Sequence, residues 1–184
     1  RDRDAGQPDH DRPRGPRVGA RARRTGPVPI PVKCRGRDVG AVEQELFGVA
    51  APGGFELYDP LQGTRTFDLA GGDTAVDTTI PSHPVRSASA DFGSANPAAI
   101  SAHINVGRVL DFLRMVLKRD SVDDEGMEVV SVVNCVDSES EDPPQWANAT
   151  WWRGKMWFGQ ELDASGKLAS YAAHLDLVGH EIMH

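Results

Sequence analysis

The spacing of apolar residues predicts short β segments between residues 33 and 96. Across residues 33–96 the apolar positions occur in brief runs separated by Gly, Pro and Asp, which is typical of strands joined by turns. Two such runs, 55–58 and 65–69, flank a stretch with Pro60 and Gly63 in turn positions. We therefore predict a β-hairpin there, with a scaffold role.

A long helix is predicted next, with Ser94 or Asn96 as its N-cap and Pro97 in its first turn. Apolar residues recur at helical spacing through about Lys118: Ile100, Ile104, Val109, Leu110, Phe112, Leu113, Val116 and Leu117. We expect this helix to be central to the fold. His103 lies within it, and we expect a hydrogen-bonded core histidine rather than a metal ligand.

The next segments predict strands separated by an acidic loop. Residues 127–133 are rich in β-branched side chains and predict a strand. In the acidic segment 138–144, solvation is favoured over calcium binding. Residues 145–159 predict two strands around an Arg153–Gly154 turn, and all four tryptophans of the chain fall in this window. A core role explains some of these tryptophans, and their concentration also suits the wall of a groove.

Composition adds limits on the class of protein. The 184 residues suffice for one domain with a core, and the hydrophobic content of 39% and formal charge of −7 fit a globular protein rather than a nucleic-acid binder. The chain has no apolar run of about 18 residues, so we predict no membrane span and no membrane partner. Cys34 and Cys135 leave both a disulfide and two free thiols open.

The first residues differ from the rest in charge and composition. Residues 1–24 contain eight arginines and four aspartates, a local charge of +4 that leaves −11 for the remainder. Ala5 is the only apolar residue up to Arg17, and prolines recur through Pro31. We predict that residues 1–32 are a disordered tail or the remnant of a pro-segment. A nucleic-acid patch is the weaker alternative, because the arginines have neither aromatic partners nor a helical register.

The end of the chain carries the pattern that indicates chemistry. His180 and His184 are four residues apart with Glu181 directly after the first, which is typical of a zinc-binding helix with its own general base. On a helix the two imidazoles project from one face and can reach one ion at about 2 Å. Glu181 lies about 100° around the helix, where it can take a proton from a zinc-bound water.

A chance match to this five-residue pattern is the simpler alternative. Against it stands the apolar character of the same helix, in which Leu175, Val178 and Ile182 share one face and Leu177 and Met183 flank that face. A helix that is apolar over most of its circumference is expected to be buried. We therefore expect the polar triplet to face a cleft walled by the tryptophan-rich strands.

Three blocks in this part of the chain resemble the thermolysin-like neutral metallopeptidases: 148–151, 156–159 and 176–184. They occur in the order and at about the spacing of the family's edge strand, hairpin and active-site helix. The helix after Asn96 and the hairpin around Pro60 extend the resemblance more loosely to about residue 36. The resemblance implies an α+β fold: a β-hairpin-rich N-terminal lobe, spanning 33–184, with a long central helix and a zinc helix at the bottom of a cleft.

The resemblance also implies a role for each matching residue. His180 and His184 are expected to bind Zn²⁺, with Glu181 as the catalytic base. Asp176 matches a calcium-binding aspartate, and as a carboxylate in the first helical turn it also suits the helix dipole. Asn148, Ala149 and Trp151 match the edge strand that binds an extended peptide. The implied enzyme is a secreted zinc metalloendopeptidase that hydrolyses protein or peptide substrates and contains Ca²⁺.

The chain departs from the family pattern in one respect. The family's third zinc ligand and its transition-state donors come from a later, C-terminal helical lobe, which is therefore an expected partner. With two ligands we expect poor zinc affinity and no turnover by the 184 residues alone. Two other hypotheses stay open: a non-catalytic peptide-binding or inhibitory remnant of such an enzyme, and a zincin of another branch.

Overall fold

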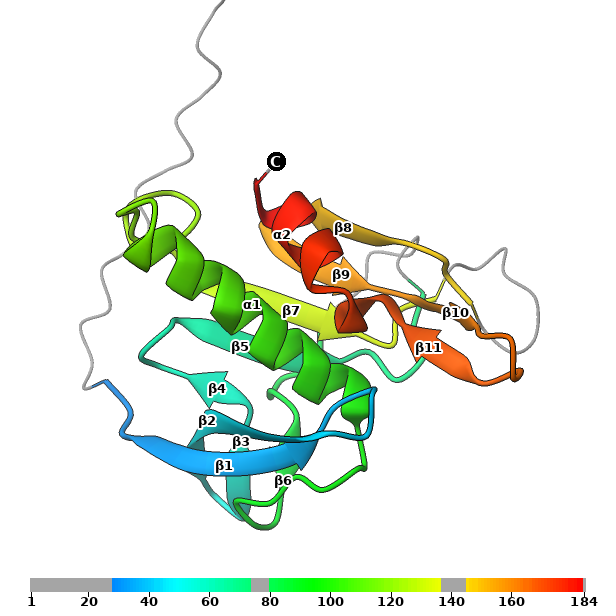
Figure 1. Ribbon diagram of the computed structural model, residues 1–184. Coiled ribbons are helices and arrows are strands. Elements are labelled where there is room, and N and C mark those ends of the chain that lie inside the picture. Colours follow the sequence, from blue (N-terminus) through cyan, green and yellow to red (C-terminus); the bar gives the residue numbers. More distant parts are fainter. Residues whose placement is uncertain (1–27, 74–79, 137–144, 184) are drawn as a thin grey trace, which may run out of the picture.

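Two β-sheets meet across one long helix in the structure, a computed structural model that describes residues 28–73, 80–136 and 145–183 (Figure 1). The helix is α1 (Pro97–Met115), and it contacts strands of both sheets. Its N-terminal half lies against the sheet formed early in the chain, and its C-terminal half lies beside the last helix, α2 (Leu175–Met183). Helix and sheets are thus segregated as in an α+β fold, which confirms the predicted class.

The first sheet is antiparallel with the order β1-β2-β3-β6, in which β1 is Pro31–Arg37, β2 is Glu43–Ala51, β3 is Gly54–Glu56 and β6 is Arg86–Ser87. Pro31 begins the edge strand, where a missing N–H is tolerated. The outer edge of β1 pairs with the segment 90–93, since Arg37 N donates to Gly93 O at 2.7 Å and Phe92 N donates to Arg35 O at 2.8 Å. That edge is therefore covered.

The second sheet is mixed, with the order β4-β5-β7-β9-β8. Its strands are β4 (Tyr58–Asp59), β5 (Thr64–Asp68), β7 (Val129–Val133), β8 (Ala149–Trp152) and β9 (Lys155–Phe158). β7 lies parallel to both β5 and β9, whereas β8 and β9 form an antiparallel hairpin. β8 is an edge strand. The strands predicted around Arg153–Gly154 and within 127–133 are thus confirmed, the latter from Val129 onward.

The predicted hairpin is confirmed only for its inner part. β4 pairs with β5 through Tyr58↔Arg65 and Asp59↔Thr64, around the predicted turn. The preceding residues of the predicted first strand belong instead to β3, in the other sheet. The chain changes sheets at fully buried Leu57, so the apolar run that predicted a single strand contains two short ones.

Helix α1 begins as predicted and ends earlier. The Asn96 side chain accepts a hydrogen bond from Ala99 N at 3.1 Å, and Pro97 is the first helical residue. The helix was expected to reach about Lys118. It ends at Met115, because Lys118 takes a left-handed φ of 57° and Arg119 N donates back to Leu113 O at 2.9 Å.

Only part of the apolar face predicted for α1 is buried. Ile100, Val109, Leu110 and Leu113 lie in the core, whereas Phe112 is 49% and Val116 59% exposed. Leu113 in the same turn is 1% exposed, so Phe112 and Val116, four residues apart, lie on the side of α1 that faces away from the core. His103 is buried as predicted, with Nδ1 3.0 Å from Thr66 Oγ1 and Nε2 3.0 Å from Phe47 O. It therefore joins α1 to both sheets.

The rest of the chain is a short hairpin followed by α2. β10 (Gln160–Leu162) and β11 (Leu168–Ser170) form a two-stranded sheet that leads into the 3₁₀ turn η1 (Tyr171–Ala173). Residues 1–27 of the predicted tail and the acidic segment 138–144 lie outside the described residues, so those predictions are not tested. In the described segments, no helix has both the length and the apolar character required to cross a membrane.

Candidate functional site

Helix α2 is held in place by one buried face and by the turn that precedes it. Val178 and Ile182, four residues apart, are buried in the main hydrophobic core. Asn105 of α1 donates from Nδ2 to Ala172 O at 2.8 Å, which fixes η1 against α1. Gly179 faces α1, where an added Cβ would lie 3.9 Å from Val109 Cγ2. These contacts set the rotation of α2 about its axis and thereby the direction of its polar residues.

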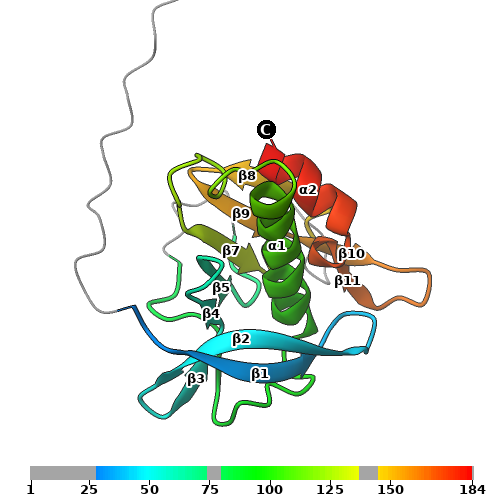
Figure 2. The same ribbon diagram turned by 60° about the vertical axis from the view of Figure 1, so that its left-hand side comes forward.

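The helix is less buried than its apolar sequence predicted. Leu175 is 44% and Met183 52% exposed, and Val178 and Ile182 are the only residues of α2 in the buried class. The physical reason is geometric: α1, η1 and β8 contact α2 from one side (Figure 2). The site consequently lies at the surface of this chain, with His180 exposed and Glu181 half-buried.

Glu181 points toward the edge strand β8. Its Oε2 accepts a hydrogen bond from the backbone N of Trp151 at 3.2 Å. Glu181 lies about 60° from Val178 around the helix, on the flank of the buried face, and that is the flank β8 occupies. The sequence expectation that the carboxylate faces the tryptophan-rich strands is therefore met by a direct contact. A carboxylate held by a backbone donor has one fixed oxygen and one that remains for other partners.

The three residues predicted to bind peptide lie on or beside the free edge of β8. Asn148 is exposed, and its Oδ1 accepts from Ala149 N at 2.9 Å. The amides of Ala149 and Trp151 are two residues apart and so point to the same side of the strand, away from β9. Both are occupied by side-chain oxygens, of Asn148 and Glu181 respectively. An extended peptide added to this edge meets these two groups first.

Most of the tryptophans serve packing rather than the site. Trp157 is 3% exposed and forms a second hydrophobic cluster with Val132 and Cys135, against which Trp146 packs. Trp151 packs on the main core, and Trp152 is 40% exposed with the Arg153 guanidinium 4.3 Å above its ring. Trp146 and Trp157 therefore do not form a groove wall beside Glu181, and Trp151 contacts Glu181 through its backbone N, so a groove wall formed by Trp151 stays a prediction.

The metal ligands predicted on α2 are only partly described. His180 offers its imidazole on the exposed side of the helix, whereas His184 lies outside the described residues. Within the described residues no group of three or more His, Cys, Asp or Glu side chains is placed to hold a metal ion. Asp176 is exposed in the first turn of α2. A neutral imidazole next to a carboxylate is the right donor chemistry for zinc, so the residues present fit that ion as an incomplete set.

Asn105 is a positioning residue that the sequence analysis did not single out. It lies on the buried side of α1, and its amide fixes the turn that feeds α2. A polar residue interrupting the apolar positions of a predicted helix was the available signal, because a buried amide requires a partner. The partner itself, a carbonyl 67 residues later, was not recognisable from local pattern.

The two cysteines take no part in the site. Both are free thiols and both are buried. Burial raises the pKa of Cys34, and it raises the pKa of Cys135 to about 12. Since the thiolate is the reactive form, neither side chain is suited to nucleophilic or redox chemistry.

Comparison with protein families gives a match over most of the chain. Residues 35–184 match the family described as "Thermolysin metallopeptidase, catalytic domain". The matched region includes every described residue of the candidate site. It begins within β1 and leaves out the arginine-rich segment.

Several relatives match part of the chain. "Neutral protease NprE" of Bacillus pumilus is 30% identical over 120 residues, which cover 65% of this chain and 36% of that protein. "Bacillolysin" of Bacillus subtilis (strain 168) is 30% identical over 120 residues, covering 65% of this chain and 20% of that protein. "Gelatinase" of Enterococcus faecalis is 34% identical over 89 residues, covering 48% of this chain and 16% of that protein. The aligned part of the chain thus spans about a third or less of these relatives.

One solved structure, "Precursor of Protealysin, Metalloproteinase from Serratia proteamaculans", superposes with a TM-score of 0.46 at 20% sequence identity. The superposition covers 66% of this chain and 33% of that one.

Proposed function

This chain belongs to the thermolysin metallopeptidase family, and from that membership we propose that it is part of the catalytic domain of a zinc-dependent endopeptidase. The proposed substrates are proteins or peptides cleaved at internal bonds. The observation that carries the proposal is the hydrogen bond from Trp151 N to Glu181 Oε2, which joins the proposed base to the proposed peptide-binding strand. Family membership removes the alternative of another zincin branch.

The proposed roles follow from the positions of the side chains. A peptide lies along β8 by backbone hydrogen bonds, with Asn148, Ala149 and Trp151 as its contacts. His180 and His184 hold Zn²⁺, which when bound acts as a Lewis acid that makes water nucleophilic near neutral pH. Glu181 is the general base: one carboxylate oxygen is held by Trp151 N and the other is left to accept the proton. This division keeps the base at a fixed distance from the peptide strand.

The proposal also covers what these residues do not supply. We expect the 184 residues to have no turnover alone, since the proposal assigns them two zinc-binding histidines and the described residues contain no group of three His, Cys, Asp or Glu placed to hold a metal ion. A C-terminal helical lobe is proposed to complete the site, and Asp176 is proposed to bind Ca²⁺ in that longer form. Secretion is proposed because the family resemblance implies it.

Zinc binding is tested by following the histidine ring signals during a Zn²⁺ titration. We expect saturable shifts at His180 and His184 and none at buried His103. The His180→Ala variant should lose the shift at His184, because one imidazole binds zinc poorly. Shifts of equal size at exposed His83 or His174, unaffected by this variant, would rule the pair out as the ligands.

The exposed edge of β8 supports a second candidate, a peptide-binding remnant without catalysis. The two are separated by hydrolysis and binding measured together on the longest natural form of the protein. An enzyme hydrolyses a peptide, and Glu181→Gln abolishes hydrolysis while peptide binding persists. A remnant binds the peptide without hydrolysis in either form. Hydrolysis by the isolated 184 residues, abolished by Glu181→Gln, would refute the expectation that they are inactive alone.

A further inference from the structure

A cavity of 370 Å³ lies at the N-terminal end of α1, away from Val109, where α2 packs. Its walls come from the end of β5, from the 83–96 loop and from the first turn of α1. The lining combines the apolar residues Val85, Phe92 and Ile100 with the polar residues Asp68, His83 and Arg86. Its volume is that of a small-molecule site.

The carboxylate of Asp68 is held firmly without a cation. Oδ1 accepts from Ala70 N and from Asn134 Nδ2, each at 2.8 Å, and Oδ2 accepts from Asn96 Nδ2 at 2.8 Å. These three neutral donors occupy three of about four acceptor positions on the carboxylate. No Lys, Arg or His of the described chain forms a salt bridge with it. One acceptor position on Oδ2 and the negative charge thus remain for a ligand.

The guanidinium of Arg86, which lines the cavity, is already paired. Arg86 binds the Glu56 carboxylate through Nε at 2.9 Å and Nη2 at 2.5 Å, and His83 Nδ1 lies 3.7 Å from the same oxygen. With Arg86 neutralised by Glu56, the charge that Asp68 contributes is left uncompensated. The cavity therefore favours a cation over an anion.

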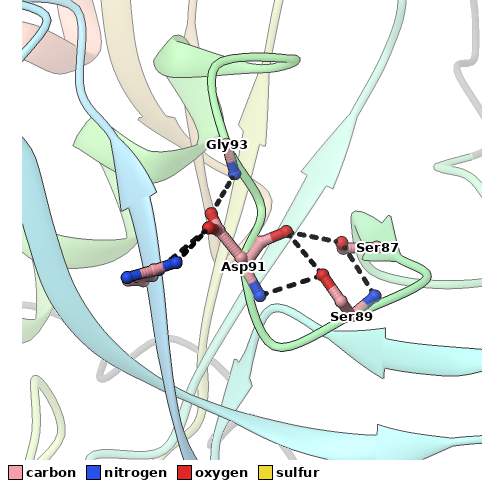
Figure 3. A network of polar contacts seen from close by, with 5 residues as sticks. Ser87, Ser89, Asp91 and Gly93 are labelled. Atoms are coloured by element: carbon pink, nitrogen blue, oxygen red, sulfur yellow. Dashed lines mark hydrogen bonds and ion pairs between the residues drawn. The ribbon is translucent and has the colours of Figure 1, made fainter.

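The loop that walls the cavity is pinned by its own hydrogen bonds (Figure 3). Asp91 O accepts from Ser87 Oγ at 3.0 Å and from Ser89 Oγ at 3.1 Å, and Asp91 Oδ1 accepts from Gly93 N at 2.8 Å. Asp91 Oδ2 accepts from Arg35 Nε at 2.8 Å, which ties the loop to β1. A wall fixed at both ends keeps the cavity open in advance of binding.

We propose that this cavity binds a primary ammonium ion that carries a compact apolar group. The ammonium donates to Asp68 Oδ2, and the apolar group lies against Val85, Phe92 and Ile100. Both free amines and the amino terminus of a peptide have this chemistry. The site is separate from Glu181 and its peptide strand, so it goes beyond the proposed protease function.

The test uses the 184-residue chain with benzylammonium as the probe, and benzyl alcohol and phenylacetate as its neutral and anionic counterparts. Binding is followed by backbone amide shifts at neutral pH. We expect saturable shifts at the amides of Asp68, His83, Val85 and Arg86 and of residues 92–96, with a dissociation constant of about 1 mM or tighter for the ammonium only. A dipeptide with a free amino terminus, compared with its acetylated form, decides whether the site also takes peptide termini.

Two variants and one control localise the binding. Asp68→Asn should weaken it at least about tenfold, because a charge-assisted hydrogen bond is lost. Ala95→Leu fills the cavity, leaves the Asp68 contacts intact and should block binding. Asp111→Asn, which removes the same charge from α1 outside the cavity, should change nothing. Absence of saturable shifts in the unmodified chain, equal binding of benzyl alcohol, or full binding by Ala95→Leu would each overturn the proposal.

Discussion

The two helices α1 and α2 meet in the structure but differ in how completely the rest of the chain covers them. Ala98–His103 of α1 are all buried, and the helix has a side-chain N-cap and contacts with both sheets. α2 has two residues in the buried class, and Leu175 and Met183 at its ends are about half exposed. Most of the helical contribution to the core of the described chain therefore comes from α1, whereas α2 adds Val178 and Ile182 to that core and leaves its other side chains more exposed.

This difference predicts that the same substitution, leucine to alanine, lowers the free energy of unfolding by different amounts on the two helices. Leu110→Ala on α1 should lower the free energy of unfolding by about 2–5 kcal/mol, because Leu110 is 1% exposed and leaves a cavity. The matched Leu175→Ala on α2 should cost less than about 1 kcal/mol, since that side chain is 44% exposed. Urea unfolding at pH 7 measures both. Similar costs at the two positions would mean that α2 is part of the same cooperative core.

The pH dependence of stability sharpens the role of α1. Burial is the largest influence on His103 and lowers its pKa, while the Phe47 carbonyl and Asp59 oppose that effect. As pH falls, the unfolded chain therefore protonates His103 at a higher pH than the folded chain does. This contribution to stability is complete above the unfolded pKa of about 6.5 and is lost as pH falls below it, by up to about 1.4 kcal/mol per pH unit.

The measurement is the free energy of unfolding from pH 7.5 down to pH 5.5, for the unmodified chain and for His103→Gln. We expect the variant to be less stable at pH 7.5, because the ring contacts of His103 with Thr66 and Phe47 are lost. Its stability should change less across this range, because glutamine does not titrate. An identical slope in the two proteins would assign the pH dependence to other groups.

Replacing a glycine on each helix by alanine is expected to stabilise the chain at α2 and to leave its stability about unchanged at α1. Gly179→Ala should stabilise the chain by about 0.5–1 kcal/mol, because alanine is the better helix former and its Cβ finds ordinary contact distance to Val109. Gly107→Ala gains the same propensity, but its Cβ collides with Gln62 Oε1. Gln62 donates to Asp111 at 2.9 Å, and we expect loss of that bond to cancel the gain. Thermal unfolding compares them, and stabilisation by both would contradict the packing described for α1.

The sequence predicted the start of α1 correctly, whereas it overestimated how much of α2 is buried. An N-cap, a first-turn proline and apolar spacing are local signals, and they placed the N-cap of α1 at Ser94 or Asn96, of which the structure has Asn96. Its end depended on the left-handed φ of Lys118, a conformation that nothing in the local pattern indicated. The burial of α2 was overestimated because apolar periodicity states which face can be covered, not whether a partner covers it.

For the candidate site, local spacing predicted His180 and Glu181, whereas the residues that surround them in the structure come from distant parts of the sequence. The hydrogen bond from Trp151 N to Glu181 joins residues 30 apart, and it depends on β8 being an edge strand. The apolar face of α2 and the tryptophan-rich window predicted that the carboxylate faces these strands, and the family blocks implied the same proximity, but neither indicated which backbone group would bind Glu181. Asn105 was missed for the same reason: its partner is set by packing between α1 and η1.

The smallest expected effect on stability is at the proposed catalytic base. Glu181→Gln keeps an oxygen that can accept from Trp151 N, and residue 181 is half-buried on the more exposed helix. The free energy of unfolding should therefore change by no more than about 0.5 kcal/mol. Loss of the negative charge should nevertheless abolish proton acceptance in the longest natural form of the protein, lowering kcat by about 10²-fold or more.

Together, unfolding and kinetic measurements on this one variant separate the two helices by function. If Glu181→Gln unfolds as easily as Leu110→Ala, α2 belongs to the structural core and the distinction fails. If stability is unchanged and kcat persists, Glu181 is not the base. Unchanged stability with lost turnover is the expected result, because a half-buried side chain can carry charge for chemistry without a large cost to folding.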